Sequence, residues 1–373
     1  MSRPDNSQTI DPRPDSEPKP AELVSIANLT KYFSVDSGLL SRALGSRERV
    51  KAVDGVDLTI RRGETVGVIG ESGSGKSTLA RTIARLQEPT DGSIRFDGEH
   101  IETQSESALK PLRRRIQYVF QDPLSALNPR KTVGESVRKP LDVHDIGDPD
   151  ERWDRVASLF EEVGLSSSDL DSYPHELSGG QQQRVGICRA LIIEPELVIF
   201  DEPVSALDVT LQAQILNLIN RFQRELELTC LIISHDLDVV RHVCDRLVVM
   251  YAGEIVEKGP TRDLFADPHH PYTRALVHAI PSIEVDSARD YELLSEETPS
   301  AIDPPSGCRF HPRCPEFIDG NCIKSKPSLK TTKDDNNRMV ACHWQELSQA
   351  KRKNHTPPSE SERAVIKQEV DTQ

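Results

Sequence analysis

One glycine-rich segment has the residue types and spacing of a phosphate-binding loop: Gly70-Glu71-Ser72-Gly73-Ser74-Gly75-Lys76-Ser77-Thr78. Residues 65–69 before it predict a short buried strand, and residues 76–86 after it carry apolar side chains at helical spacing. Glycines let backbone N–H groups curl around phosphate oxygens, and the helix N-terminus adds its positive dipole end. Lys76 would reach the β- and γ-phosphates, and the Ser77 hydroxyl would bind Mg²⁺.

Two further motifs follow later in the chain. Leu177-Ser178-Gly179-Gly180-Gln181 stands directly before a helical pattern at residues 182–193. Residues 197–200 are apolar and end in Asp201 and Glu202, which predicts a buried strand that delivers two carboxylates to the phosphate site. In this order, the three motifs resemble the ATP-binding subunit of an ABC (ATP-binding cassette) transporter. The resemblance implies an α/β fold, a P-loop NTPase core of ABC type with an antiparallel β subdomain and a helical subdomain.

The resemblance also implies roles in ATP hydrolysis. Glu202 corresponds to the general base that polarises the attacking water, and Asp201 corresponds to the aspartate that holds Mg²⁺. Gln121, after the strand-like residues 116–120, corresponds to a glutamine that contacts Mg²⁺ or water and senses the membrane partner. His235 corresponds to the histidine that contacts the γ-phosphate, and Asp208 belongs to a loop that crosses a dimer interface. In the family, the Leu-Ser-Gly-Gly-Gln segment of one subunit closes over the ATP of another, so a dimer is expected.

The adenine ring is expected to stack on an aromatic residue near the start of the chain. Phe33 is the preferred residue, and its neighbour Tyr32 is the alternative because a shift of one position exchanges them. The expected catalytic residues are Glu202, His235, Gln121 and Lys76. The residues expected to bind ATP are Phe33, Gly70, Glu71, Ser72, Gly73, Ser74, Gly75, Lys76, Ser77, Thr78, Gln121, Ser178, Gly179, Gly180, Gln181, Asp208 and His235. The expected Mg²⁺ ligands are Ser77, Gln121 and Asp201.

The C-terminal part narrows the resemblance. Residues 267–276, which include His270-Pro271-Tyr272-Thr273, and residues 307–315, 322 and 340–344 resemble the C-terminal extension of oligopeptide/dipeptide importer ATPases. The resemblance implies a translocase that energises peptide uptake with a second ATPase subunit, identical or distinct, two transmembrane permease subunits and an extracellular solute-binding protein. The same group also handles nickel and some sugars, so these solutes remain alternatives.

The seven cysteines divide into two sets. Three lie in apolar contexts and are expected to be buried core thiols: Cys188, Cys230 and Cys244. The other four lie in a segment with few apolar residues: Cys308, Cys314, Cys322 and Cys342. Four thiolates suit an iron–sulfur cluster or tetrahedral zinc, and a cytoplasmic setting disfavours disulfides. The spacing C-x₅-C-x₇-C-x₁₉-C lacks the short CxxC pairs of common zinc sites, so a [4Fe-4S] cluster is preferred. Zinc and metal-free thiols remain open, as do His311 and His343 as substitute ligands.

Composition limits the classes of function. The net charge is −14, with Asp+Glu 60 against Lys+Arg 46, which argues against a nucleic-acid-binding surface. Arginine outnumbers lysine about two to one, a pattern typical of a high-salt cytoplasm, although an ordinary acidic bacterial protein is the alternative. No apolar run approaches the roughly 18–20 residues that cross a bilayer, and the polar, proline-rich start predicts no signal peptide. We therefore expect a peripheral protein at the cytoplasmic face of the cell membrane.

The predicted domain organisation follows these composition changes. No internal repeat is present, so one cassette is expected. A soluble, non-transport ATPase of the same superfamily is an alternative, whereas the intact Glu202 opposes a non-hydrolysing subunit. The predicted segments are a disordered N-terminal segment at 1–21, an ATPase domain at 22–262 with a helical subdomain at about 121–176, a helix and acidic linker at 263–303, a small cysteine-containing C-terminal module at 304–345 and a disordered tail at 346–373.

Overall fold

The computed structural model describes residues 21–35, 48–279, 299–318, 320–332 and 337–347. The segments 1–21 and 346–373, which the sequence predicts to be disordered, lie almost entirely outside these ranges. Most of the predicted acidic linker, residues 280–298, also lies outside them. Within the described residues, none of the helices combines the length and the apolar character that crossing a membrane requires.

The larger sheet has eight strands in the order β11-β12-β10-β9-β3-β8-β7-β6. Five of them, from β9 to β6 in that order, run parallel, and the remaining three join by antiparallel pairing. All residues of β3, β7 and β8 are buried, as the continuous apolar runs of parallel strands require. The strands are β3 (Thr65–Ile69), β6 (Ile116–Val119), β7 (Leu197–Asp201), β8 (Thr229–Ile233), β9 (Arg246–Tyr251), β10 (Glu254–Pro260), β11 (Lys330–Thr331) and β12 (Met339–Val340).

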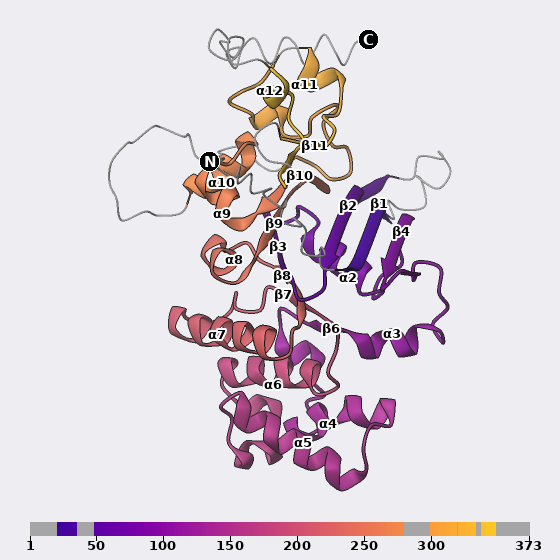
Figure 1. The fold of residues 1–373 in the computed structure, drawn as a ribbon, viewed down its shortest axis with the longest axis vertical. Helices are drawn as coiled ribbons and strands as arrows, with labels where there is room; N and C mark the ends of the chain where they lie inside the picture. The colour runs from indigo at the N-terminus through magenta and orange to yellow at the C-terminus, as the bar shows by residue number, and fades with distance from the viewer. Residues whose placement is uncertain (1–20, 36–47, 280–298, 319, 333–336, 348–373) are drawn as a thin grey trace, which may run out of the picture.

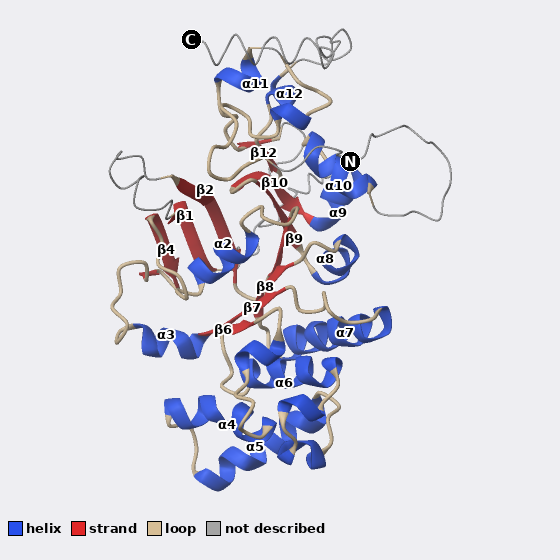
Figure 2. Cartoon of the chain, turned by 180° about the vertical axis from the view of Figure 1, so that it is seen from behind, coloured by secondary structure: helices blue, strands red, loops and turns tan. Residues whose placement is uncertain are grey.

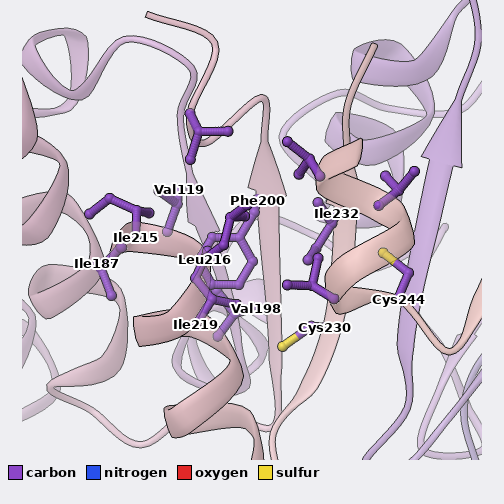
Figure 3. Packing of buried hydrophobic residues seen from close by; sticks show 14 of the residues in the cluster. Val119, Ile187, Val198, Phe200, Ile215, Leu216, Ile219, Cys230, Ile232 and Cys244 are labelled. Atoms are coloured by element: carbon purple, nitrogen blue, oxygen red, sulfur yellow. The ribbon is translucent and has the colours of Figure 1, made fainter. Parts of the chain in front are cut away.

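Helices lie along this sheet (Figure 1), and most of the apolar side chains of its strands are buried. The helices next to it are α2 (Lys76–Ile83), α3 (Leu109–Arg115), α6 (Gly179–Leu191), α7 (Val209–Glu225) and α8 (Leu237–Val243). Figure 3 shows Val198 and Phe200 of β7 packed against Ile215, Leu216 and Ile219 of α7. The apolar stripe of α7 therefore fixes the strand whose C-terminal end carries the two carboxylates.

A second, smaller sheet is antiparallel throughout, in the order β2-β1-β4-β5. Its strands are β1 (Glu22–Ser34), β2 (Arg49–Arg61), β4 (Asp91–Phe96) and β5 (Glu99–His100). Helix α2 packs against both sheets, and its Leu79 and Ile83 share one buried cluster with Leu29 of β1 and Val56 of β2. The helix that follows the phosphate loop is therefore held between the two sheets.

The helical part lies at one end of the molecule (Figure 2). It contains α4 (Val133–His144) and α5 (Pro149–Glu162), which pack with α6, and three short 3₁₀ turns at Pro123–Ala126, Ser167–Asp171 and Pro174–Glu176. Capping boxes begin both long helices, from Thr132 to Glu135 and from Asp148 to Glu151.

The cysteine-bearing module, residues 304–345, lies at the opposite end (Figure 1). Its short strand β12 pairs with β10, so the module continues the larger sheet. The buried carboxylate of Glu257 on β10 accepts a hydrogen bond from Arg338 at 3.1 Å. The elements near this end are α9 (Thr261–Ala266), α10 (Pro271–His278), a 3₁₀ turn at His311–Arg313, α11 (Asn321–Lys324) and α12 (His343–Glu346).

Candidate nucleotide-binding site

The phosphate loop lies between the buried strand β3 and the first turn of α2. Gly70 and Gly75 adopt φ values of 152° and 102°. A Cβ atom at Gly70 would lie 2.2 Å from the carbonyl oxygen of Met250, and one at Gly75 would lie 2.0 Å from that of Ala52. The loop therefore needs glycine at both positions for conformation and for space.

Lys76 and Ser74 are two buried polar residues of this loop. The buried Lys76 ammonium donates to the carbonyl oxygens of Gly70 and Glu71, both at 2.8 Å. Burial lowers the pKa of Lys76, whereas the nearby carboxylates raise it. The Ser74 hydroxyl is buried without a hydrogen-bond partner among the described residues. Within the part of the chain that the structure describes, Lys76 has no ion-pair partner and the Ser74 hydroxyl has no hydrogen-bond partner, and phosphate oxygens would satisfy both groups.

Asp201 ends β7 and meets the loop directly. Ser77 Oγ donates to Asp201 Oδ1 at 2.7 Å, so the structure brings together two of the three predicted Mg²⁺ ligands. Tyr118 on β6 donates its hydroxyl to Asp201 Oδ2 at 2.6 Å, and Arg81 of α2 lies 3.5 Å from the same oxygen. Burial and the hydrogen bond to Asp201 raise the pKa of Tyr118. Neither Tyr118 nor Arg81 belongs to a motif that sequence reasoning identifies as part of the site.

Glu202 stands at the centre of the predicted catalytic group. Gln121 Nε2 donates to one carboxylate oxygen at 2.8 Å, and His235 Nδ1 lies 3.1 Å from the other. The backbone of Glu202 has a positive φ of 50°, an uncommon conformation for a non-glycine residue. Its N–H donates to the carbonyl oxygen of Ile233 on β8, which fixes this conformation. The predicted base, glutamine and histidine therefore converge beside the loop.

The Ser178–Gln181 segment forms the N-terminal cap of α6. The Gln181 N–H donates to Ser178 Oγ, and the Ser178 N–H donates to Gln181 Oε1 at 3.0 Å, a complete capping box. Ser178 and Gly179 are exposed and Gly180 is buried. Asp208 caps α7 by accepting from Leu211 N at 3.0 Å. Among the described residues, no hydrogen bond or ion pair joins these positions to the phosphate loop of the same chain.

Phe33 and Tyr32 occupy neighbouring positions on β1 and differ in exposure. The Tyr32 hydroxyl donates to Asp54, and burial together with this hydrogen bond raises the pKa of Tyr32 to about 12. Phe33 is 36% exposed as a residue, and Lys31 Nζ lies 5.0 Å from the centroid of its ring. Phe33 therefore presents the more accessible aromatic surface, which favours it for stacking on adenine.

The two sets of cysteines differ in their surroundings. Cys188, Cys230 and Cys244 are buried core thiols, as the sequence predicts. Burial raises the pKa of Cys314, and Cys342, Cys308 and Cys322 raise it further. The backbone N–H of Cys308 donates to the carbonyl oxygen of Cys322 at 2.8 Å.

The predicted metal ligands of the module are not arranged as a metal site within the described residues. The described part of the chain contains no group of three or more His, Cys, Asp or Glu side chains placed to hold a metal ion. The alternative ligands His311 and His343 each place a ring nitrogen 2.9 Å from a backbone carbonyl oxygen, those of Cys308 and Ser325.

The fold and this site define an ABC-type ATPase. The ABC transporter family model matches residues 53–205, and the model of the oligopeptide/dipeptide transporter C-terminal region matches residues 256–322. The oligopeptide transport ATP-binding protein AppF of Bacillus subtilis is 46% identical over 86% of this chain and 97% of that protein. The dipeptide transport ATP-binding protein DppF of Haemophilus influenzae is 44% identical over 86% of this chain and 96% of that protein.

A solved structure supports the same assignment. The dimeric post-hydrolysis state of the ATP-binding cassette MJ0796, bound to ADP and Pi, has a TM-score of 0.58 at 32% identity. The match covers 64% of this chain and 99% of that one. The chain therefore belongs to the ATP-binding subunits of the ABC transporter family, and it carries the C-terminal region of the oligopeptide/dipeptide group.

A buried histidine in this C-terminal region makes stability depend on pH. His270 caps α10 by accepting the Tyr272 N–H at Nδ1 (3.1 Å). Burial, and secondarily Arg274, lower the pKa of His270 to about 3. Because an unfolded histidine has a pKa of about 6.5, the unfolded chain binds the extra proton first as pH falls. We expect this residue to reduce the free energy of unfolding by about 2 kcal/mol between pH 7 and pH 5.

Urea unfolding of the wild type and His270→Asn at both pH values measures this effect. Asparagine keeps an acceptor for the helix cap and removes the titrating ring. The variant is expected to lose about 2 kcal/mol less stability than the wild type on acidification. Substitution of the exposed His175 by asparagine is the matched control. Equal pH dependence in wild type and His270→Asn would contradict the assignment.

Proposed function

We propose that this chain is the ATP-hydrolysing subunit of an ABC importer for oligopeptides or dipeptides. The observation that carries the proposal is the convergence of Gln121 and His235 on Glu202, next to the Ser77–Asp201 contact. The names of the relatives and the matched C-terminal region support peptides as the solute. Nickel and sugars remain the alternative solutes.

The mechanism assigns each step of hydrolysis to groups of the site. Backbone amides of residues 70–78 and the Lys76 ammonium would hold the β- and γ-phosphates. Ser77, Asp201 and Gln121 would hold Mg²⁺, which neutralises charge on the phosphate oxygens when bound. Glu202 would orient the attacking water and accept its proton.

His235 and Gln121 have two roles in this mechanism. In the present arrangement both side chains contact the Glu202 carboxylate and fix its orientation. With ATP bound, His235 would contact the γ-phosphate, and Gln121 would contact Mg²⁺ or water. This exchange would release the Glu202 carboxylate from Gln121 and His235 when ATP binds. The orientation of the catalytic carboxylate would then depend on whether the γ-phosphate is present.

A second ATPase subunit would complete each site. Ser178, Gly179, Gly180 and Gln181 stand at the N-terminus of a 13-residue helix, with Ser178 and Gly179 exposed. A helix N-terminus of this kind is suited to a phosphate, here the γ-phosphate held by the facing subunit. Asp208 would lie at the same interface. The assembly would include two permease subunits and an extracellular solute-binding protein, with this chain at the cytoplasmic face of the membrane and no role in nucleic-acid binding.

We also propose that Cys308, Cys314, Cys322 and Cys342 bind an iron–sulfur cluster. All four thiols are buried or half-buried, and burial raises the pKa of each. A metal centre would stabilise them as thiolates. Anaerobic purification is expected to give absorption near 400 nm and about four irons and four sulfides per chain. One zinc per chain, or no metal, would contradict the cluster.

Transport into proteoliposomes tests the solute. The chain is reconstituted with its partner ATPase, permease subunits and binding protein, and uptake of labelled dipeptides, oligopeptides, nickel and a disaccharide is compared. We expect ATP-dependent uptake of peptides only. The Glu202→Gln variant is the negative control and should support no uptake. Uptake of nickel or the sugar in place of peptides would overturn the peptide assignment, and ATP hydrolysis that no permease or solute affects would favour a soluble ATPase.

A further inference from the structure

Glu71, the second residue of the phosphate loop, contacts two residues from the far C-terminal part of the chain. Arg313 binds both carboxylate oxygens, at 2.9 Å to Oε2 and 3.1 Å to Oε1. Tyr272 accepts the backbone N–H of Glu71 at 2.7 Å through its hydroxyl oxygen. The side chain and the backbone of one loop residue are therefore both fixed from outside the catalytic core.

The two contacting residues are themselves held rigidly. Tyr272 is fully buried, and its ring centroid lies 4.6 Å from that of Tyr251 and 5.4 Å from that of Phe310. Only 5% of the Arg313 side chain is exposed, and its guanidinium also donates to the Tyr251 hydroxyl at 3.3 Å. Tyr251 contacts both Tyr272 and Arg313, and it therefore fixes both contacts to Glu71 at the same time.

The module in turn fixes the segment that carries Arg313. Arg313 ends a 3₁₀ turn, and the following Cys314 N–H donates to the carbonyl oxygen of His311 at 3.3 Å. Arg309, earlier in the same segment, pairs with Asp54 of β2 and lies 2.9 Å from Glu254 of β10. The position of the guanidinium at Glu71 thus depends on the fold of the module and on its attachment to both sheets.

We propose that Arg313 and Tyr272 are positioning residues for ATP binding, so that the cysteine-bearing module forms part of the nucleotide site. The inference rests on the proposal that residues 70–78 bind the phosphates of ATP. An unpaired Glu71 carboxylate would repel these phosphates, and Arg313 neutralises it and holds it in one orientation. Lys76 donates to the carbonyl oxygen of Glu71, so displacement of Glu71 would also move a partner of the phosphate-binding lysine.

Equilibrium binding of ATP tests the inference. The parent for every comparison is the full chain carrying Glu202→Gln, in which hydrolysis does not interfere with the measurement. Arg313→Gln is expected to weaken ATP binding about tenfold, the size of coupling typical of groups in contact. Tyr272→Phe, which keeps the ring and removes the acceptor, is expected to weaken binding a few-fold. Arg313→Lys keeps the charge but not the two-oxygen contact and should fall between Arg313→Gln and the parent.

Arg274→Gln is the matched control because Arg274, on α10, is an arginine of the same C-terminal region and pairs with Glu316 of the module. Its ATP affinity should stay within about twofold of the parent, below the coupling typical of groups in contact. Introducing Arg313→Gln into a Glu71→Gln chain should likewise change the affinity less than about twofold, because no carboxylate remains to be neutralised.

The outcomes separate this inference from the proposed function. If the parent chain binds ATP and Arg313→Gln binds it equally well, the inference fails and the proposed function stands. If Arg313→Gln weakens binding equally in the parent chain and in the Glu71→Gln chain, or only in proportion to a lowered unfolding midpoint, Arg313 has a structural role and the inference also fails. If the parent chain does not bind ATP and Lys76→Ala changes nothing, the proposed function fails.

Discussion

Glu202→Gln is expected to reduce steady-state ATP hydrolysis on the order of 10²–10⁴-fold while ATP still binds. Glutamine has nearly the same shape and can keep hydrogen bonds to Gln121 and His235, but it cannot accept a proton from water. Phosphate release and equilibrium ATP binding, measured on the same preparation, separate the two effects. Because unhydrolysed ATP would stay between the two subunits of the proposed dimer, the variant should also accumulate as an ATP-bound dimer in size-exclusion chromatography.

Glu227→Gln is the matched control for this substitution. Glu227 is exposed and has a φ of 49°, close to the 50° of Glu202, so both changes place glutamine at a similar backbone conformation. Glu227 follows α7 and lies outside the predicted site. Its substitution should leave hydrolysis within about twofold of the wild type, as expected for a surface change. Persistent hydrolysis in Glu202→Gln would contradict the assignment of Glu202 as the base.

Gly75→Ala is expected to abolish measurable ATP binding and to destabilise the fold by about 3 kcal/mol or more. The new Cβ atom would lie 2.0 Å from the carbonyl oxygen of Ala52, a backbone atom of β2 that cannot rotate away. The φ of 102° adds strain for any residue with a side chain. Relief requires the first turn of α2 to move, and that turn carries Lys76 and Ser77.

Gly73→Ala provides the comparison within the same loop. Gly73 also has a positive φ, 79°, but an added Cβ would meet nothing within 4 Å. Only the backbone strain of about 1–2 kcal/mol is then expected. Urea unfolding and ATP affinity should therefore rank the wild type first, Gly73→Ala second and Gly75→Ala last. Equal losses in both variants would show that steric contact with Ala52 is not the decisive factor.

Sequence patterns predicted the parts of the site that lie in local motifs. The spacing of residues 70–78, and a strand that ends in Asp201 and Glu202, require only neighbouring residues and a buried strand. The expectation that Ser77 and Asp201 meet at one point follows because the loop after β3 and the end of β7 lie at the same edge of a parallel sheet.

Contacts between distant segments could not be predicted in this way. Tyr118 has the appearance of an ordinary strand residue, and only the pairing of β6 with β7 places its hydroxyl at Asp201. Arg313 and Glu71 are separated by more than 200 positions, and no periodicity relates them. The difference in exposure between Tyr32 and Phe33 also could not be predicted, because Asp54, the partner of Tyr32, lies on another strand.

The pairing of β12 with β10 also matters for how the chain is made. Without β12, the outer edge of β10 would present free N–H and C=O groups, a surface on which other polypeptides can add a strand and aggregate. Ribosomal synthesis releases β10 first and must still add residues 261–338 before β12 can cover that edge. The nascent ATPase core therefore passes through an interval of vulnerability to misassembly, which ends when the last part of the module docks.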